Sequence, residues 1–182
     1  MIITETALLK PIAQATVPAW TKPFDAAEYG PGSRVYVCES LLRRLGLIED
    51  RLLQRLGLST SRPKSILPAV LAPERSYVAL AIKSGGVSHT DIRRELPFEH
   101  LSILEHLVGL CKLQRGGQPG LLLNDVHVTV AYLEDRKGKV FPAHINWHDG
   151  SWNFWDSKLD GKHAGGPYGA GIRVICPGQA TL

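Results

Sequence analysis

Three side chains in this sequence have the types needed to activate a thiol at neutral pH: Cys38, His127 and Asn146. A cysteine at the start of a helix has its thiolate favoured by the helix dipole, and a neutral imidazole can accept its proton. Such an imidazole needs a third group that fixes its tautomer, and a carboxamide on the neighbouring strand is well placed to do this. The three residues are therefore candidates for a nucleophilic site.

A helix is predicted directly after Cys38. Arg34 to Val37 is rich in β-forming residues, and the chain then switches to apolar residues spaced three and four apart, which indicates a helix. Gly46 or Gly57 is expected to break it. The apolar positions are Leu41, Leu42, Leu45, Ile48, Leu52, Leu53 and Leu56.

Leu121 to Asp156 is predicted to form a three-stranded antiparallel meander. Asp149-Gly150 is typical of a two-residue type I′ turn, which pairs Trp147 with Trp152 and Asn146 with Asn153. Asp135 to Gly138 is expected to be a four-residue loop that pairs Tyr132 with Phe141 and His127 with Asn146.

This register assigns every side chain of the meander to one of two faces. The core face carries apolar residues: Val126, Val128, Val130, Tyr132, Phe141, Ala143, Ile145, Trp147, Trp152 and Phe154. The other face carries short hydrogen-bonding groups beside one aromatic residue, as a pocket wall would: Asp125, His127, Thr129, His144, Asn146, His148, Ser151, Asn153 and Trp155.

The order of these residues resembles the papain-like cysteine peptidases and their amidase relatives, in which a cysteine at a helix start precedes a histidine and an asparagine or aspartate on successive strands. The resemblance implies that Cys38 is the nucleophile, His127 the general base and Asn146 its orienting group, with Asn146-Trp147 similar to the family's Asn-Trp pair. No glutamine directly precedes Cys38 to donate to an oxyanion. Viral leader proteinases look similar in size, and their pattern would match His144 with Asp156 instead, on different faces in this register.

Several alternatives stay open. Cys38 could be a buried apolar thiol, as we expect for Cys111 and Cys176. A zinc site of His127, His144 and His148 is conceivable, but diagonal neighbours lie ~7 to 8 Å apart, so neither a metal nor another cofactor is expected. His127-Val128-Thr129-Val130 and His100-Leu101-Ser102-Ile103 resemble the paired motifs of the 2H phosphoesterases. The polar face could also be a non-catalytic surface that recognises a protein or ligand.

Composition narrows the class of protein. A chain of 182 residues can bury about 70% of its unfolded surface, so its core needs no metal or disulfide. The net charge of +4 is mild, and acidic residues interleave with the basic cluster between Arg43 and Lys64, which disfavours nucleic acid as a partner. No run approaches the ~18 apolar residues of a membrane span, and the first residues lack the features of a secretory signal. We therefore expect a cytoplasmic protein.

The sequence predicts one α+β domain, residues 34–182, in which an antiparallel sheet packs against helices from the N-terminal half. Residues 1–33 are proline-rich and are expected to form an extended arm. Further elements are predicted at Ser76 to Ile82 (strand), after a Ser88–Asp91 capping box (short helix), from Pro97 to about Lys112 (helix) and at Ile172 to Cys176 (last strand). The expected function is a papain-like thiol hydrolase that cleaves peptide or isopeptide bonds in a polypeptide substrate.

Overall fold

A seven-stranded sheet organises the chain in the computed structural model, which describes residues 2–22, 24–48, 72–83, 86–97, 99–125, 127–157 and 171–180. Its strands lie in the order β2 (Leu9–Val17), β4 (Arg75–Ile82), β8 (Arg173–Pro177), β5 (Thr129–Glu134), β6 (Val140–His148), β7 (Ser151–Asp156) and β3 (Val35–Val37). Two further short strands, β1 (Ile2–Ile3) and β9 (Gln179–Ala180), form a separate parallel pair.

The sheet is mixed. Strand β5 runs parallel to β8, and β3 runs parallel to β7, whereas the other neighbours are antiparallel. The predicted α+β class is confirmed, and the meander β5–β6–β7 is present. A simple antiparallel sheet is wrong, because parallel pairing joins segments from distant parts of the chain and leaves no turn signature in the sequence.

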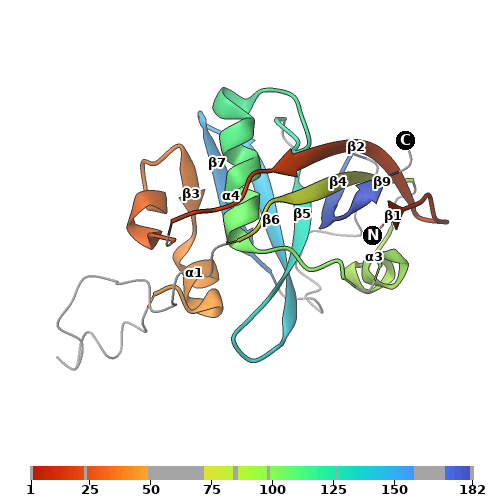
Figure 1. Cartoon of the computed structure of the whole chain (residues 1–182), viewed down its shortest axis with the longest axis horizontal. Helices are drawn as coiled ribbons and strands as arrows, with labels where there is room; N and C mark the ends of the chain where they lie inside the picture. Colours follow the sequence, from red (N-terminus) through yellow and green to blue (C-terminus); the bar gives the residue numbers. More distant parts are fainter. Residues whose placement is uncertain are drawn as a thin grey trace.

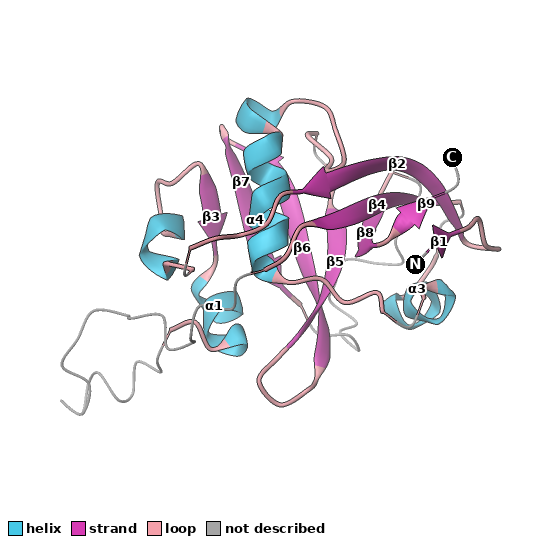
Figure 2. Cartoon of the chain, viewed as in Figure 1, coloured by secondary structure: helices cyan, strands magenta, loops and turns pink. Residues whose placement is uncertain are grey.

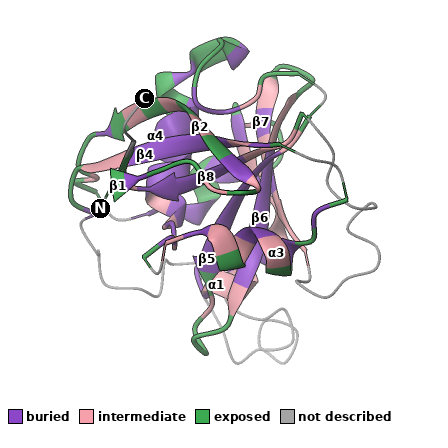
Figure 3. Ribbon diagram, turned by 90° about the vertical axis from the view of Figure 1, so that its right-hand side faces the viewer, coloured by how far each residue is buried: buried purple, intermediate pink, exposed green. Residues whose placement is uncertain are grey.

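Apolar cores lie on both faces of the sheet. Helix α4 (Leu104–Leu113) crosses one face, where Leu107 and Val108 join a core with Phe141 and Phe154. Helix α3 (His89–Glu95) supplies the other face, where its Ile92 packs with residues of β4, β5 and β8. The remaining helical segments are η1 (Ala26–Tyr29), α1 (Glu39–Leu45) and η2 (Arg115–Gly117). Figures 1 and 2 show α4 over the sheet with α1 and α3 towards opposite ends, and Figure 3 shows how buried the central strands are.

The β6–β7 hairpin has the predicted register. Asp149 and Gly150 both adopt positive φ angles, 50° and 77°, as a type I′ turn requires. Trp147 pairs with Trp152, and their rings lie 5.3 Å apart. Trp152 is buried and Trp147 is half-buried, so the expected tryptophan pair on the core face is present.

The predicted register of β5 is wrong by one residue. Asp135 and Lys139 pair through a backbone hydrogen bond of 2.9 Å, which shortens the loop to three residues, with Gly138 at a φ of 74°. The Asp135 carboxylate stabilises this turn by accepting hydrogen bonds from the backbone N–H groups of Lys137 and Lys139. Thr129 therefore pairs with Ile145, and Val130 pairs with His144.

A shift of one residue turns every side chain of a strand to the opposite face. Ala131 and Leu133 consequently lie in the core under α4, whereas Val130 and Tyr132 lie in the core near α3. The predicted core members on β6 and β7 are correctly placed, and those on β5 are not.

The boundaries of three predicted segments differ in the structure. Residues 9–17, within the expected arm, form β2, and Pro11 lies at its register shift on the edge of the sheet, where a missing N–H is tolerated. The helix predicted from Pro97 begins only at Leu104, and residues 99–103 are non-helical. The Ser102 N–H donates to the carbonyl of Tyr132 on β5, so it is not available for a helical hydrogen bond. Helix α1 ends at Gly46, which adopts the left-handed conformation. Gly57 and its neighbours lie outside the described residues.

The capping box that begins α3 is present as predicted, and its loss should destabilise the protein. The Ser88 hydroxyl accepts from the Asp91 N–H, and the Asp91 carboxylate accepts from the Ser88 N–H. We expect Ser88→Ala to lower the free energy of unfolding by about 1 kcal/mol. Urea denaturation measures this, with exposed Thr90→Ala on the same helix as the matched control; equal losses in both variants would contradict the assigned role of the box.

Candidate active site

Cys38 is the residue directly before α1, as the sequence predicts. Its backbone is extended, and its carbonyl accepts the first helical hydrogen bond, from Leu42 N–H at 3.2 Å. Its own N–H donates to the carbonyl of Phe154 on β7 at 3.0 Å. The half-buried thiol is thus anchored where β3 ends, beside the C-terminal part of β7.

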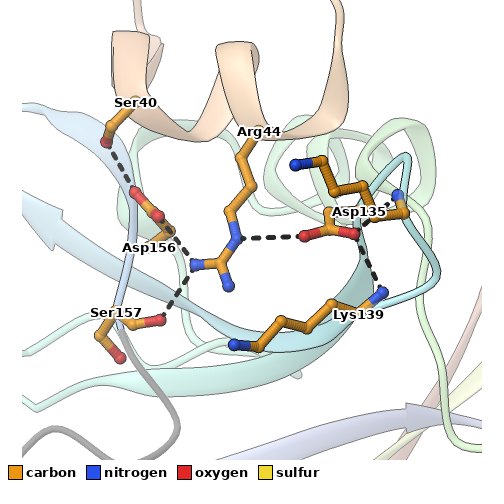
Figure 4. A network of polar contacts seen from close by, with 7 residues as sticks. Ser40, Arg44, Asp135, Lys139, Asp156 and Ser157 are labelled. Carbon is orange, nitrogen blue, oxygen red and sulfur yellow. Dashed lines mark hydrogen bonds and ion pairs between the residues drawn. The ribbon is translucent and has the colours of Figure 1, made fainter.

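A polar network connects Cys38 to β7, and Figure 4 shows the part of it that joins Ser40, Asp156 and Arg44. The Cys38 Sγ lies 3.1 Å from the Ser40 hydroxyl, which donates to Asp156 Oδ1 at 2.6 Å. Arg44 donates to Asp156 Oδ2 at 3.1 Å and lies 3.9 Å from Asp135. Asp156 is therefore fixed between two residues of α1, one of which also contacts the thiol.

His144 lies on β6, directly across from Trp155. Its imidazole is 6% exposed, packs edge-on against the Trp155 ring at 5.4 Å and stacks on His89 of α3 at 5.7 Å. The hydroxyl of Ser157 lies 3.4 Å from its Nε2. Burial lowers the pKa of His144 to about 4, although the charge of Asp156 opposes the shift, so the ring is neutral at pH 7.

Cys38, His144 and Asp156 lie towards the same end of the sheet, and ordinary strand spacing puts Cys38 and His144 about 10 Å apart across two strands. Cys38 packs against the core under α4, whereas His144 stacks on His89 of α3. Continuing the β3–β7 register by one residue places Cys38 beside Trp155, whose other neighbour is His144. Asp156 follows Trp155 in the chain, and its side chain leaves the opposite face of β7.

The structure does not bring Cys38, His127 and Asn146 together. His127 precedes β5 and lies near the opposite end of β7, about 10 Å along the strands and about 14 Å across them from Cys38, from ordinary strand dimensions. The predicted pairing of His127 with Asn146 is wrong, because the shifted β5 register places residue 128 opposite Asn146. Instead, His127 Nδ1 pairs with Asp125 at 3.1 Å, and the ring contacts Gly171.

The remaining residues of the predicted polar face have different environments. Thr129 is buried on the α4 face, where its hydroxyl accepts from Leu123 N–H. His148 is exposed beside Asp149, Asn153 Nδ2 donates to the carbonyls of His148 and Ser151, and Trp155 is half-buried. The Oδ1 atom of Asn146 is buried without a hydrogen-bond partner among the described residues.

The predicted alternatives built on histidines find no geometric support. Among the described residues, no three His, Cys, Asp or Glu side chains are grouped so that they could hold a metal ion, and this covers His127, His144 and His148. His100 Nδ1 lies 2.8 Å from the carbonyl oxygen of Pro97, to which it donates. The Ser102 N–H donates to the carbonyl of Tyr132 rather than contacting Thr129, so the two 2H-like motifs are not adjacent strands.

Three residues around this site were not expected from the sequence: Ser40, His89 and Ser157. The local sequence around each of them does not indicate a role, because each contacts a different segment of the chain. His89 directly follows a recognisable N-cap serine, yet nothing local indicates that its ring stacks on β6 and that its Nδ1 lies 3.0 Å from the Tyr132 hydroxyl.

The chain matches no protein-family model, no curated protein and no solved structure. Within the described ranges, no helix is long and apolar enough to cross a membrane.

Proposed function

We propose that this chain is a papain-like cysteine hydrolase that cleaves peptide or isopeptide amide bonds, with Cys38 as nucleophile, His144 as general base and Asp156 as the supporting carboxylate. One observation carries the proposal: Cys38 begins α1 against β7, beside the strand pair that bears His144 and Asp156. The chain order cysteine, histidine, aspartate is the leader-proteinase alternative of the resemblance, with His144 in place of His127.

The chemistry follows from the environment of each group. His144 is neutral at pH 7 and can take the Cys38 proton, after which the thiolate attacks the amide carbonyl carbon. The imidazolium then gives its proton to the leaving amine, and water hydrolyses the thioester. Asp156 raises the pKa of His144 against the effect of burial, so its charge stabilises the imidazolium formed in the first step.

The geometry also defines what the reaction requires. Cys38 and His144 are neighbours of Trp155 on its two sides. The thiol contacts Ser40 and the core under α4, whereas the imidazole lies on the α3 side, so the reaction requires the Cys38 side chain to turn towards His144. The backbone N–H of Cys38 is occupied by the carbonyl of Phe154 and holds the nucleophile rather than an oxyanion. The absence of a glutamine directly before Cys38 is a second departure from the papain-like pattern. It too removes a group that would donate a hydrogen bond to the oxyanion.

A second candidate is a non-catalytic domain that binds a protein or ligand through the β6–β7 face. The observation that favours it is the group of polar residues that stay accessible there: His148 is exposed, and Ser151, Asn153 and Trp155 are half-buried. Such a surface can supply directional hydrogen bonds beside an aromatic ring. A binding domain needs no reactive thiol, so the reactivity of Cys38 distinguishes it from the hydrolase.

The test is the reactivity of Cys38 towards iodoacetamide at pH 6. We expect Cys38 to react faster than glutathione, because the neutral His144 can accept the thiol proton as the new S–C bond forms, whereas Cys111 and Cys176 stay unmodified. Both are buried, and burial raises the pKa of each thiol, to about 12 for Cys176. Mass spectrometry of tryptic peptides gives the three rates separately.

Three histidine variants make the result specific. His144→Gln should reduce the Cys38 rate to that of glutathione or below, and His148→Gln, on the same strand but exposed, should leave it unchanged. His127→Gln should also leave it unchanged if His144 is the base. A Cys38 rate no faster than glutathione in the unmodified protein would reject the hydrolase and favour the binding domain.

A further inference from the structure

A cavity of about 540 Å³ lies on the α4 side of the sheet, away from Cys38. Residues from η1, the loop into β3, the C-terminal end of α4 with η2, and the β6–β7 hairpin line it. Val35, at the start of β3, is in its wall, whereas Cys38 follows the other end of that strand. Its volume is in the range of cavities that bind small molecules, and peptide hydrolysis does not require it.

The aromatic wall of the cavity is fixed by its surroundings. Trp152 is 1% exposed, and its Nε1 donates to the carbonyl of Gln114 at 3.1 Å. Trp147 packs against Trp152 and against Gly117, where a Cβ atom would lie 2.4 Å from the indole. Gly117 also has a φ of 69°, so glycine is doubly required there. The indole surface is therefore in place before any ligand arrives.

The charges that line the cavity are mainly positive. Arg34, Lys112 and Arg115 face a single carboxylate, Glu28, among the described lining residues. Lys112 already donates to the Tyr29 hydroxyl at 3.0 Å and lies 4.4 Å from the centre of the Trp20 ring. Burial raises the pKa of Tyr29 to about 12, so this phenol adds no negative charge.

Within the described part of the chain, the side chains of Arg34 and Arg115 form no hydrogen bond or ion pair, so both can bind a ligand. Arg34 precedes β3, Arg115 lies in η2, and both are exposed. A guanidinium forms its strongest hydrogen bonds with anionic groups that present two oxygen atoms, such as carboxylates, sulfonates and phosphates, and a flat ring stacks favourably on an indole. The combination selects for a ligand that has both features.

We propose that this cavity binds a small aromatic anion, whose ring lies against Trp147 and whose acidic group is held by Arg34 and Arg115. The site is separate from the proposed hydrolytic residues, so its occupant is neither the scissile amide nor its product.

Two fluorescent probes with similar rings test this. 1-Anilinonaphthalene-8-sulfonate carries an anionic sulfonate, and N-phenyl-1-naphthylamine lacks it. Titration of the whole chain should show the sulfonate probe binding about tenfold more tightly than the neutral one. This factor corresponds to the free energy of one charge-assisted hydrogen bond. Equal binding of both probes, or binding of neither, would overturn the proposal.

The double variant Arg34→Gln with Arg115→Gln locates the effect. It should weaken binding of the sulfonate probe by at least about tenfold and leave the neutral probe unchanged. Arg94→Gln is the matched control, because Arg94 is an exposed arginine on α3 that does not line the cavity. If the double variant binds the sulfonate probe as Arg94→Gln does, the anion site is not here. Circular dichroism of all variants confirms that the fold is retained.

Discussion

Replacing His144 by glutamine should reduce the Cys38-dependent hydrolysis of peptide aminomethylcoumarin amides by at least about a thousandfold in kcat/KM, as removal of a general base from a nucleophilic site generally does. The imidazole is the group that both activates the thiol and protonates the leaving amine. Glutamine retains a similar volume and a hydrogen-bonding end for Ser157 but accepts no proton. The loss should appear mainly in kcat.

Matched variants separate this effect from a loss of folding. His148→Gln removes an exposed imidazole from the same strand and should leave kcat/KM unchanged. Asp156→Asn should reduce activity less than His144→Gln does, because it removes only a supporting charge. Retention of activity in His144→Gln together with its loss in His127→Gln would instead favour the site that the sequence first suggests.

A loss of stability in mild acid is the second large effect that we expect. Burial lowers the pKa values of both His89 and His144 to about 4, and the proximity of the two rings contributes to the shift of His89. The unfolded chain binds protons at these residues below pH about 6.5, whereas the folded protein does not. The contribution of the two neutral imidazoles to the free energy of unfolding is therefore fully present above pH 6.5 and is lost as the pH falls towards 4. The total loss is at most about 3 kcal/mol for each imidazole.

Urea denaturation between pH 7.5 and 4.5 measures this dependence. The double variant His89→Gln with His144→Gln should show a much flatter profile over that range, whereas His148→Gln should follow the unmodified protein. Carboxylates with lowered pKa values, such as Asp91 and Asp135, act mainly below this window, because their ordinary values already lie near 4. An unchanged slope in the double variant would assign the acid sensitivity to other groups.

Local signals in the sequence are sufficient for several elements. Asp149-Gly150 determines the β6–β7 register, the Ser88–Asp91 pair begins α3, and the apolar spacing after Cys38 places the thiol at the start of α1. Each depends on contacts within a few residues. The β5 register differs from the predicted one because the Asp135 side chain stabilises a three-residue turn rather than a four-residue one, and the composition of the turn allows both.

Tertiary contacts decide what the sequence could not predict. The parallel pairing of β3 with β7 places Cys38 at the same end of the sheet as His144 and Asp156, and no local pattern indicates it. Once β7 is next to Cys38, distance disfavours His127, which the sequence alone favours as the base. The candidate residues were thus recognisable by type, and their grouping required the fold.

The parallel pairing of β3 with β7 also has a consequence for biosynthesis. Each residue of Val35–Val37 pairs with a residue 117 positions later in the chain, within Trp152–Phe154. A nascent chain emerging from the ribosome exposes the thiol long before the partner strand exists, and closing so long a loop is slow. If the proposed chemistry holds, catalysis begins only after β7 has been synthesised, and a chain that ends before β7 lacks the strand that positions Cys38.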